Sequence, residues 1–461
     1  MKKLIVIFII LFTNFEILAD NHTSLEVVVP VNIYSPLSKS ISTSLPGSSI
    51  IIIDSNELEK NKDLPLHTIF DKKNGIKSRS IYGASSSGSK TTIDIRGMGA
   101  QAKSNVLILI NGQRLNNIDM SEIDIPSLPL ESIDRIEIFK GNAASVLYGE
   151  GAIGGAINII TNPEINAQVS NEIFIKNGTF KSKEVIWNTS QKLNLFSINT
   201  HFNHFETDGY RDENEQLQNN LNSEIRFPGK RGDHFISINL SEQIMSTPSD
   251  RSQNQLFTDR RGSDTPDDYI NSIGGSIYYG FENNINDFKT LILNGSFRIK
   301  DSYSDLQSTS SPSYSDTSLT NYQFTPRINH TLNYFNKISK LTYGLDFQYA
   351  DYKSYRKENE NSIPLHVYDA WQATQSLYFQ QSTYINKKTS LGTGMRLQRN
   401  SIAIGDHLDT SAPDYAGWQK KHTTLLDEEF NYALNIGIDR SIFNNSEVYS
   451  RIGNGFRYPN F

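Results

Sequence analysis

The chain has 461 residues, about three times the length of an ordinary single domain. It carries 44 basic and 50 acidic residues, for a formal net charge of −6, and no basic block indicates a nucleic-acid partner. The absence of cysteine excludes disulfide bonds, thiolate metal sites and a cysteine nucleophile. Hydrophobic residues make up only 37% of the chain, although it contains 22 Tyr and 24 Phe. This composition favours a β-sheet with one face in contact with water over a large apolar globular core.

The N-terminus has the pattern of an export signal. Met1, Lys2 and Lys3 precede an apolar run of about nine residues, which is too short to span a bilayer as a helix. We predict a signal peptide over residues 1–19, with cleavage after Ala19. No other apolar run reaches about 18 residues. A membrane-spanning part of the mature chain would therefore be a β-barrel, since only helices and closed barrels satisfy their backbone polar groups in lipid.

Residues 20–48 form a polar segment that contains one isolated β-branched patch. This patch comprises Leu25, Glu26, Val27, Val28, Val29 and Pro30. An exposed extended segment of this kind can add as a strand to the edge of a partner's sheet, and its proline ends the pairing. A disordered secreted N-terminus is the alternative interpretation.

Residues 49–163 are predicted to form a compact α+β domain. A strand is expected over residues 49–53. A helix follows over residues 55–60, with Ser55 as its N-cap and with Glu57 and Glu59 in its first turn. A second helix is expected over residues 64–72, and it ends before Gly75.

Residues 91–162 carry the most specific pattern of the chain. Two β-type runs, each ended by a glycine-bearing turn, precede a third run in which glycines punctuate β-branched residues. The positions that define the pattern are Arg96, Gly97, Asn111, Gly112, Arg114, Arg135, Glu137, Gly141, Tyr148, Gly149, Gly154 and Gly155.

One part of this pattern imitates a nucleotide-binding motif. Gly149, Gly151 and Gly154 fit the G-x-G-x-x-G template, which requires a helix directly after the glycines. Residues 155–161 are instead β-prone. We therefore predict no nucleotide or other cofactor, and we interpret the glycines as allowing tight turns and close approach of the backbone to a barrel wall.

Beyond Pro163 the sequence alternates strictly between apolar and polar residues, as residues 196–203, 341–349 and 430–439 illustrate. Segments of about ten residues with one apolar face are typical of a transmembrane antiparallel β-barrel with a wet lumen. A soluble sandwich or a β-helix is the alternative, because alternation does not say what the apolar face meets.

The connections between these segments differ in length. Tight turns are expected at residues 386–389 and 443–446, and long polar loops at residues 246–271, 304–319 and 403–425. Short turns at one end and long extracellular loops at the other are typical of outer-membrane barrels. We expect about 13 strands in residues 164–461, against about 22 in plugged transporters. We therefore expect a barrel truncated at its C-terminus, and a complete smaller barrel that ends at Phe461 is the alternative.

Residues 91–162 resemble the plug of TonB-dependent outer-membrane receptors, and the resemblance extends over the mature chain. It implies a barrel with the α+β plug in its lumen, in the outer membrane of a bacterium. The function implied is binding of a scarce nutrient, such as an iron-siderophore or cobalamin-like complex, and its energised import into the periplasm. The patch Leu25 to Pro30 then resembles the TonB box, and residues 453–461 resemble a motif of the barrel interior.

The resemblance also implies partners. These are TonB with its inner-membrane energising complex, a small ligand such as a metal chelate or corrinoid, outer-membrane lipid and the barrel-assembly machinery. The chain is expected to be a monomer without enzymatic activity. The ligand is expected to meet outward plug loops, where the weak candidates are Tyr82, Met98, Gln101, Asn116 and Asn117. These loops contain no cluster of cationic side chains that would decide for an anionic ligand.

Charged side chains in the plug region suggest a further hypothesis. Arg96, Arg114, Arg135, Glu137 and Lys140 are interpreted as pairing across the boundary between plug and barrel, where hydrated ion pairs rearrange easily. Ordinary surface ion pairs are the alternative.

Other chemistry receives little support from the sequence. His201 and His204 lie three apart on an expected strand, so they point to opposite faces and cannot share a metal ion. Neither H-E-x-x-H nor G-x-S-x-G occurs, and we predict no metal site and no catalytic residues. An outer-membrane hydrolase with a Ser/His/Asp set on the barrel rim, and a passive porin or adhesin, remain alternatives.

Overall fold

The computed structural model describes residues 45–458, except residues 62–63, 81–90, 120, 122, 124–132, 162–168, 231, 249, 308–312, 335–336, 413–423 and 444–445. All described residues belong to one compact unit, Asn32–Phe461. The predicted signal peptide, the patch Leu25 to Pro30 and Tyr82 lie outside the described residues, as does the expected domain boundary at Pro163.

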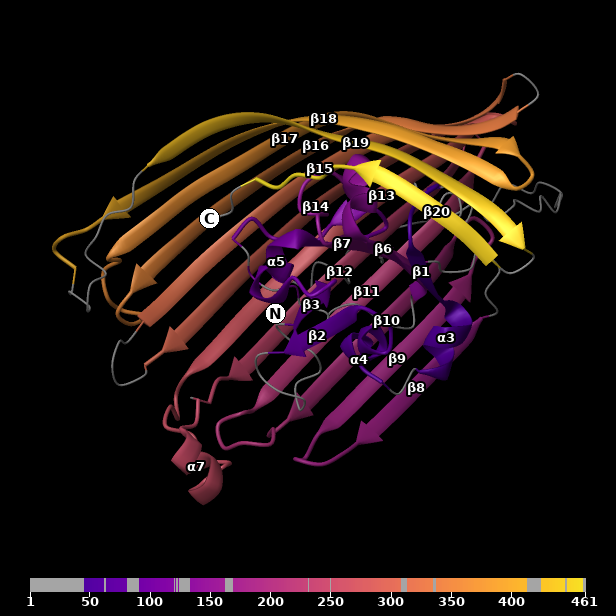
Figure 1. Ribbon diagram of the computed structural model, residues 1–461. Coiled ribbons are helices and arrows are strands. Elements are labelled where there is room, and N and C mark those ends of the chain that lie inside the picture. Colours follow the sequence, from indigo (N-terminus) through magenta and orange to yellow (C-terminus); the bar gives the residue numbers. More distant parts are fainter. Residues whose placement is uncertain are drawn as a thin grey trace. The chain divides into compact units, whose positions relative to one another are not determined.

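The N-terminal part of this unit is a small α+β domain, which we call the plug (indigo to purple in Figure 1). Its five-stranded sheet has the order β1-β6-β7-β4-β5, and β2 and β3 form a separate hairpin-like pair. The elements are β1 (Ile50–Asp54), α3 (Ser55–Lys60), α4 (Leu66–Asp71), β2 (Ile76–Ser80), β3 (Thr91–Ile95), η1 (Gly99–Gln101), α5 (Ala102–Asn105), β4 (Val106–Ile110), β5 (Gln113–Arg114), β6 (Ile133–Lys140), η4 (Gly141–Ala144), α6 (Ser145–Tyr148) and β7 (Gly155–Thr161).

Both predicted helices of the plug are present, but the N-cap of the first is one residue earlier than expected. The carboxylate of Asp54 accepts a hydrogen bond from the backbone N–H of Glu57 at 2.9 Å, so Asp54 and not Ser55 caps α3. Asp54 also ends β1, and one residue therefore closes the strand and opens the helix. The second helix, α4, begins after Pro65, whose fixed φ suits the start of a helix.

The plug sheet is buried on both faces, which explains its continuous apolar strands. On one face, Ile108, Ile138 and Ile157 pack with α3, α4 and the β2–β3 pair in the main core of the plug. On the other face, Leu107 and Phe139 pack with α6 and with Tyr378, which belongs to the large sheet described next. The second face of the plug sheet is thus turned toward the large sheet.

The remaining strands form a 13-stranded antiparallel sheet, which we call the wall. Each strand pairs with its neighbour in sequence, and Figure 1 shows them side by side from magenta to yellow. They are β8 (Ser170–Asn177), β9 (Lys183–Lys192), β10 (Ser197–Thr207), β11 (Gln216–Gly229), β12 (Gly232–Ser246), β13 (Tyr269–Asn286), β14 (Lys289–Leu306), β15 (Ser313–Tyr334), β16 (Lys337–Lys357), β17 (His366–Asn386), β18 (Thr389–Leu408), β19 (Leu425–Phe443) and β20 (Ser446–Gly453). Among the described residues, β8 and β20 are the two ends of the sheet.

Burial in the wall is inverted relative to a soluble protein. On β17, Leu377 is 57% exposed, whereas its neighbours Ser376 and Gln380 are 7% and 5% exposed. The same inversion recurs on β19, where Phe430 and Ile436 are exposed and Asn435 is buried. A face of exposed large apolar side chains backed by buried hydroxyls and amides fits a barrel between lipid and a polar lumen, and it excludes a soluble sandwich.

Connections in the wall alternate in length, as predicted, although two expected loops are shorter than predicted. β17 and β18 are joined by residues 387–388 alone, whereas residues 247–268 connect β12 to β13 and contain α7 (Gln253–Thr258). The loop expected at 304–319 is wrong for most of its length, because β14 continues to Leu306 and β15 begins at Ser313. The loop expected at 403–425 likewise starts only after Leu408. The polar residues there are cross-strand partners, and a wet lumen tolerates polar strands.

No helix in the described part of the chain is both long and apolar enough to cross a membrane.

Candidate functional site

A tight hairpin of the plug provides its main contact with the wall. Asn111 and Gly112 join β4 to β5 with φ values of 49° and 80°, and positive φ at both positions is what a two-residue type I′ turn requires. The side chain of Asn111 accepts from the backbone N–H of Thr161 at 3.0 Å and donates to Thr161 Oγ1 at 2.8 Å. The turn is thereby fixed to the end of β7.

Neutral amides bind this hairpin to the wall. Gln323 on β15 accepts from the backbone N–H of Arg114 at 3.0 Å and donates to the Arg114 carbonyl at 2.8 Å. Gln113 donates to Thr325 at 2.9 Å and accepts from Ser296 at 3.2 Å. Each of these amide bonds has an equivalent in water, so breaking them exchanges hydrogen bonds without exposing an unpaired charge.

Arginines of the wall complete the boundary by donating to acceptors of the plug. Arg298 on β14 donates to the carbonyl of Leu115 at 2.7 Å and to Asn117 Oδ1 at 2.8 Å. Arg396 on β18 donates to the carbonyls of Val146 and Leu147 at 3.4 and 3.3 Å. Arg451 on β20 donates to the carbonyl of Asn142 at 2.9 Å. Three wall strands thus hold the plug through its backbone.

The hypothesis that the plug's own charges pair across this boundary is wrong for Arg114, Arg135 and Glu137. Arg114 pairs with Glu150 at 2.5 Å and Arg135 pairs with Glu137 at 2.9 Å, both inside the plug. The second pair is not a surface pair either, since its side chains are 4% and 0% exposed. Arg135 and Glu137 lie on the same face of β6 as Phe139, where α6 and Tyr378 cover the sheet, and their spacing of two residues along the strand places the two side chains side by side.

Gly149 lies where the plug comes closest to the wall. Its φ is 83°, and a Cβ there would be 2.5 Å from Gln398 Oε1 and 2.8 Å from Arg396 Nε. This agrees with the interpretation that the glycines permit close approach to a barrel wall. Residues 155–161 form strand β7 and not a helix, which removes the structural basis of a dinucleotide site.

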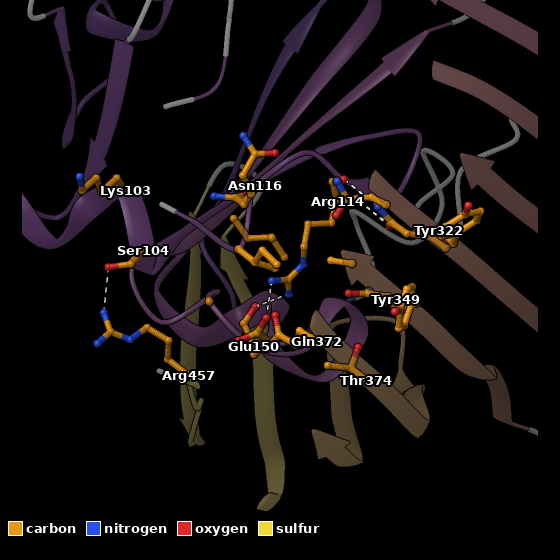
Figure 2. Close-up of a pocket in the computed structure, with 18 residues that line it drawn as sticks. Lys103, Ser104, Arg114, Asn116, Glu150, Tyr322, Tyr349, Gln372, Thr374 and Arg457 are labelled. Atoms are coloured by element: carbon orange, nitrogen blue, oxygen red, sulfur yellow. Dashed lines mark hydrogen bonds and ion pairs between the residues drawn. The ribbon is translucent and has the colours of Figure 1, made fainter. Parts of the chain in front are cut away.

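A cavity that is open to solvent lies between the plug hairpin and the wall. Figure 2 shows Arg114 reaching toward Glu150 at its floor and Arg457 toward Ser104 at its side. Its lining comprises Lys103, Ser104, Leu107, Arg114, Asn116, Asn117, Ile118, Glu150, Gly151, Asn321, Tyr322, Gln323, Gln348, Tyr349, Ala350, Gln372, Thr374 and Arg457.

The structure brings only part of the expected ligand-contact set to this cavity. Asn116 and Asn117 line it, whereas Gln101 does not, and Met98 packs against the main plug core. Asn116 is also occupied structurally, because its amide binds the backbone N–H of Ile108 and the carbonyl of Val106.

Cationic side chains gather at the cavity, which the sequence of the plug loops did not indicate. Lys103 and Arg114 come from the plug, and Arg457 comes from the segment that follows β20. Arg457 donates to Ser104 at 2.8 Å across 353 positions of sequence. The segment is held in place by Phe456 and Tyr458, which pack against Val146 of α6 and Ala433 of β19. The resemblance of residues 453–461 to a barrel-interior motif was the available signal, although it did not name Arg457 as a site residue.

The described residues contain no group of three or more potential metal ligands. His201 binds Asn188 on β9 and His204 binds Asn219 on β11, so the two rings have different neighbours.

Comparison with known proteins agrees with this architecture. Residues 44–156 match the family model described as TonB-dependent Receptor Plug Domain. The chain carries the plug domain of TonB-dependent receptors. It is 39% identical over 74 residues to the vitamin B12 transporter BtuB of Photobacterium profundum, over 16% of this chain and 12% of that protein. It is 32% identical over 149 residues to "Probable TonB-dependent siderophore receptor PirA" of Acinetobacter baumannii, over 29% of this chain and 19% of that protein.

Among solved structures, unliganded FecA, a ferric citrate transporter, superposes with a TM-score of 0.74 at 11% identity, over 88% of this chain and 62% of that chain. This likeness shows the fold alone. The chain spans less than two thirds of the length of each of these three relatives. The predicted plug domain and the plug-and-barrel fold are confirmed, and an outer-membrane location fits this fold.

Replacing Gly149 tests how closely plug and wall must fit. Gly149→Ala places a methyl group against Gln398 and Arg396. We therefore expect the plug to fit less closely against the wall and the passive leak of small solutes to increase. Gly97→Ala is the control, because Gly97 also has a positive φ of 76° but has nothing within 4 Å of its Cβ position. Both variants carry backbone strain, which is larger at Gly149, whose ψ of −142° lies outside the left-handed helical region, and only Gly149→Ala adds the clash. Liposome swelling measures the leak, and equal leak in both variants would contradict the account.

Glu137 makes plug stability depend on pH. Burial is the main cause that raises the pKa of Glu137 from 4.5 to about 7, and the Arg135 guanidinium offsets this only in part. Because the folded plug favours the neutral acid, the stabilisation is fully present below pH 4.5 and is lost as pH rises through 7. In the wild type, the free energy of plug unfolding should fall by on the order of 3 kcal/mol as the pH rises through this range. We expect Glu137→Gln to abolish this fall.

The measurement is urea unfolding at pH 5 and pH 8, followed by a spin label on a single cysteine at exposed Lys72, since the chain has no other cysteine. Glu59→Gln removes an exposed carboxylate and is the matched control. Identical pH dependence in the wild type and in Glu137→Gln would contradict the assignment.

Proposed function

We propose that this chain is a TonB-dependent receptor that binds a scarce small nutrient at the outer surface and imports it into the periplasm. The metal chelates and corrinoids named for its relatives define the range of ligands: BtuB is a vitamin B12 transporter, FecA a ferric citrate transporter. The energy would come from the inner membrane through TonB. No chemical change of the substrate is part of this proposal.

The observation that carries the proposal is the boundary between plug and wall. Gln323 of the wall binds the plug hairpin, and Gln113 of the hairpin binds Thr325 of the wall, through neutral hydrogen bonds; Arg298 binds the carbonyl of Leu115. Apolar contacts with Tyr378 and Ala433 of the wall accompany these bonds. A boundary of exchangeable hydrogen bonds favours a plug that closes the lumen at rest and moves when pulled.

Coupling to TonB would use the patch Leu25 to Pro30. Its β-branched residues suit addition as a strand to a sheet edge of the partner. A pull on this patch would reach β1 directly along the chain, and β1 is the edge strand of the plug sheet next to β6. Force on an edge strand separates its hydrogen bonds one after another, which requires less force than shearing the whole sheet at once.

Two other functions are weaker. A rim hydrolase would need a Ser/His/Asp set. The buried pair of His366, at the start of β17, and Asp406, at 2.8 Å, supplies two of these residue types and does not by itself make such a set. A passive porin needs an open lumen, whereas here Gln323, Arg298 and Arg396 bind the plug to the wall.

Deleting residues 25–30 tests the proposed coupling. We expect energised uptake to fall to background while ligand binding at the cell surface is retained, because the patch is proposed to bind TonB and not the ligand. Uptake and binding of radiolabelled iron chelates and corrinoids are measured in parallel, with a deletion of residues 37–42 as a control for segment length. Uptake that persists without residues 25–30 would contradict the proposal that transport is coupled to TonB.

A further inference from the structure

The two ends of the wall carry opposite charge. Acidic residues outnumber basic ones in the long connections at residues 208–215, 247–268 and 358–365. At the other end, the four tight connections between β11 and β18 contain one acidic residue, Asp287. Lysines lie in or directly beside all four, and we call this set the basic rim: Lys230, Lys289, Lys337, Lys387 and Lys388.

Charges near the long connections pair within the protein, whereas those of the basic rim do not. Lys183 binds Glu206 at 2.9 Å, and Lys353 binds Asp369 at 3.7 Å. Within the described part of the chain, no carboxylate forms an ion pair with a lysine of the basic rim. Four of these lysines are exposed, and Lys289 is partly buried. Their positive charge is therefore available to a partner outside the chain.

The basic rim borders the apolar face of the wall. Side chains an even number of residues apart lie on the same face of a strand. Lys337 therefore shares a face of β16 with exposed Leu345, and Lys289 shares a face of β14 with exposed Ile299. Phe288, which is 61% exposed, directly precedes Lys289. Lysines beside exposed apolar side chains are typical of the level where the hydrocarbon layer meets the lipid headgroups, because the ammonium group extends toward the headgroups.

We propose that the basic rim binds the phosphate groups of anionic phospholipids in the leaflet at the end of the tight connections. Unpaired lysines at a membrane surface attract anionic lipid, and several of them in one rim add their attraction. The tight turns of outer-membrane barrels face the periplasm, so the periplasmic leaflet supplies the lipid. The acidic connections at the opposite end repel the same headgroups.

This proposal goes beyond import and does not depend on it. It requires only that the wall spans a bilayer. Bound anionic lipid would stabilise one end of the wall, the end at which its strands are joined by tight turns.

Fluorescence quenching by lipid measures the local lipid composition at each end. Phe288→Cys and Leu426→Cys each place a single cysteine in a chain that has none, one beside the basic rim and one near the long connections. Each full chain is labelled with a small fluorophore and reconstituted in phosphatidylcholine bilayers that contain brominated phosphatidylglycerol or brominated phosphatidylcholine. We expect the anionic lipid to quench at least about twofold more than the neutral lipid at position 288, and equally at position 426.

Salt tests whether this preference is electrostatic. In 1 M NaCl the Debye length falls to about 3 Å, and the preference at position 288 should disappear. This comparison uses one protein in two buffers, so it does not depend on the folding of a further variant.

Two sets of substitutions separate the basic rim from the net charge of the chain. Removing four rim charges should abolish the preference at position 288, with the substitutions Lys289→Gln, Lys337→Gln, Lys387→Gln and Lys388→Gln. The matched control removes four positive charges at the opposite end and should leave the preference unchanged, with the substitutions Lys181→Gln, Lys183→Gln, Arg260→Gln and Lys353→Gln.

Three results would overturn the proposal. The first is equal quenching by the two lipids at position 288 in low salt. The second is a preference that persists in 1 M NaCl or in the rim variant. The third is an equal loss of preference in both sets of substitutions, which would assign the effect to net charge.

Discussion

Period-two alternation gives the wall one apolar face and one polar face, and the polar face has to be satisfied by something other than lipid. Leu377 and Ile436 lie on the apolar face, whereas Gln323, Arg298 and Arg396 lie on the other and find their partners in the plug. The plug is therefore part of what makes the wall stable. The same polar boundary keeps the plug separable, because its hydrogen bonds can be replaced by water.

The boundary between plug and wall also contains the cavity at which a ligand could be recognised. The hairpin of β4 and β5 is fixed at its turn by Thr161 and at its side by Gln323, so the cavity beside it has a defined floor. Wall and plug both line this cavity. A ligand bound there would contact both surfaces that must separate during import, and this would couple ligand binding to the position of the plug.

Much of the fold could be predicted because it rests on local patterns. Alternation such as that of residues 341–349 fixes which face of a strand meets lipid, and Asn111–Gly112 fixes a two-residue turn through its backbone preferences. The capping of α3 was misplaced by one residue, because Asp54 and Ser55 are both good caps and only the geometry decides between them. Loop lengths at 304–319 were overestimated because polar residues on a lumen-facing strand resemble a loop in sequence.

The site was less predictable, since its contacts join distant parts of the chain. Asn116 and Asn117 were expected from the plug sequence, but Asn321 and Arg457 are brought to the cavity only by the order of the wall strands and by the path of the segment after β20. The charged residues of the plug were noticed, whereas their partners were not, because Arg135 and Glu137 pair with each other along one face of β6 and not across the boundary to the wall. Sequence patterns indicate which face a residue occupies and do not indicate which distant residue it meets.

A reversible tether between plug and wall tests most directly whether the plug must move. Gln113 and Thr325, whose side chains are hydrogen-bonded across the boundary, can both be replaced by cysteine in a chain that has none of its own, and a short bis-methanethiosulfonate reagent can join the two thiols. With the cross-link closed, we predict that ligand still binds and that energised uptake stops, and that a reducing agent restores uptake. Uptake at the wild-type rate with the tether fully closed would contradict the account.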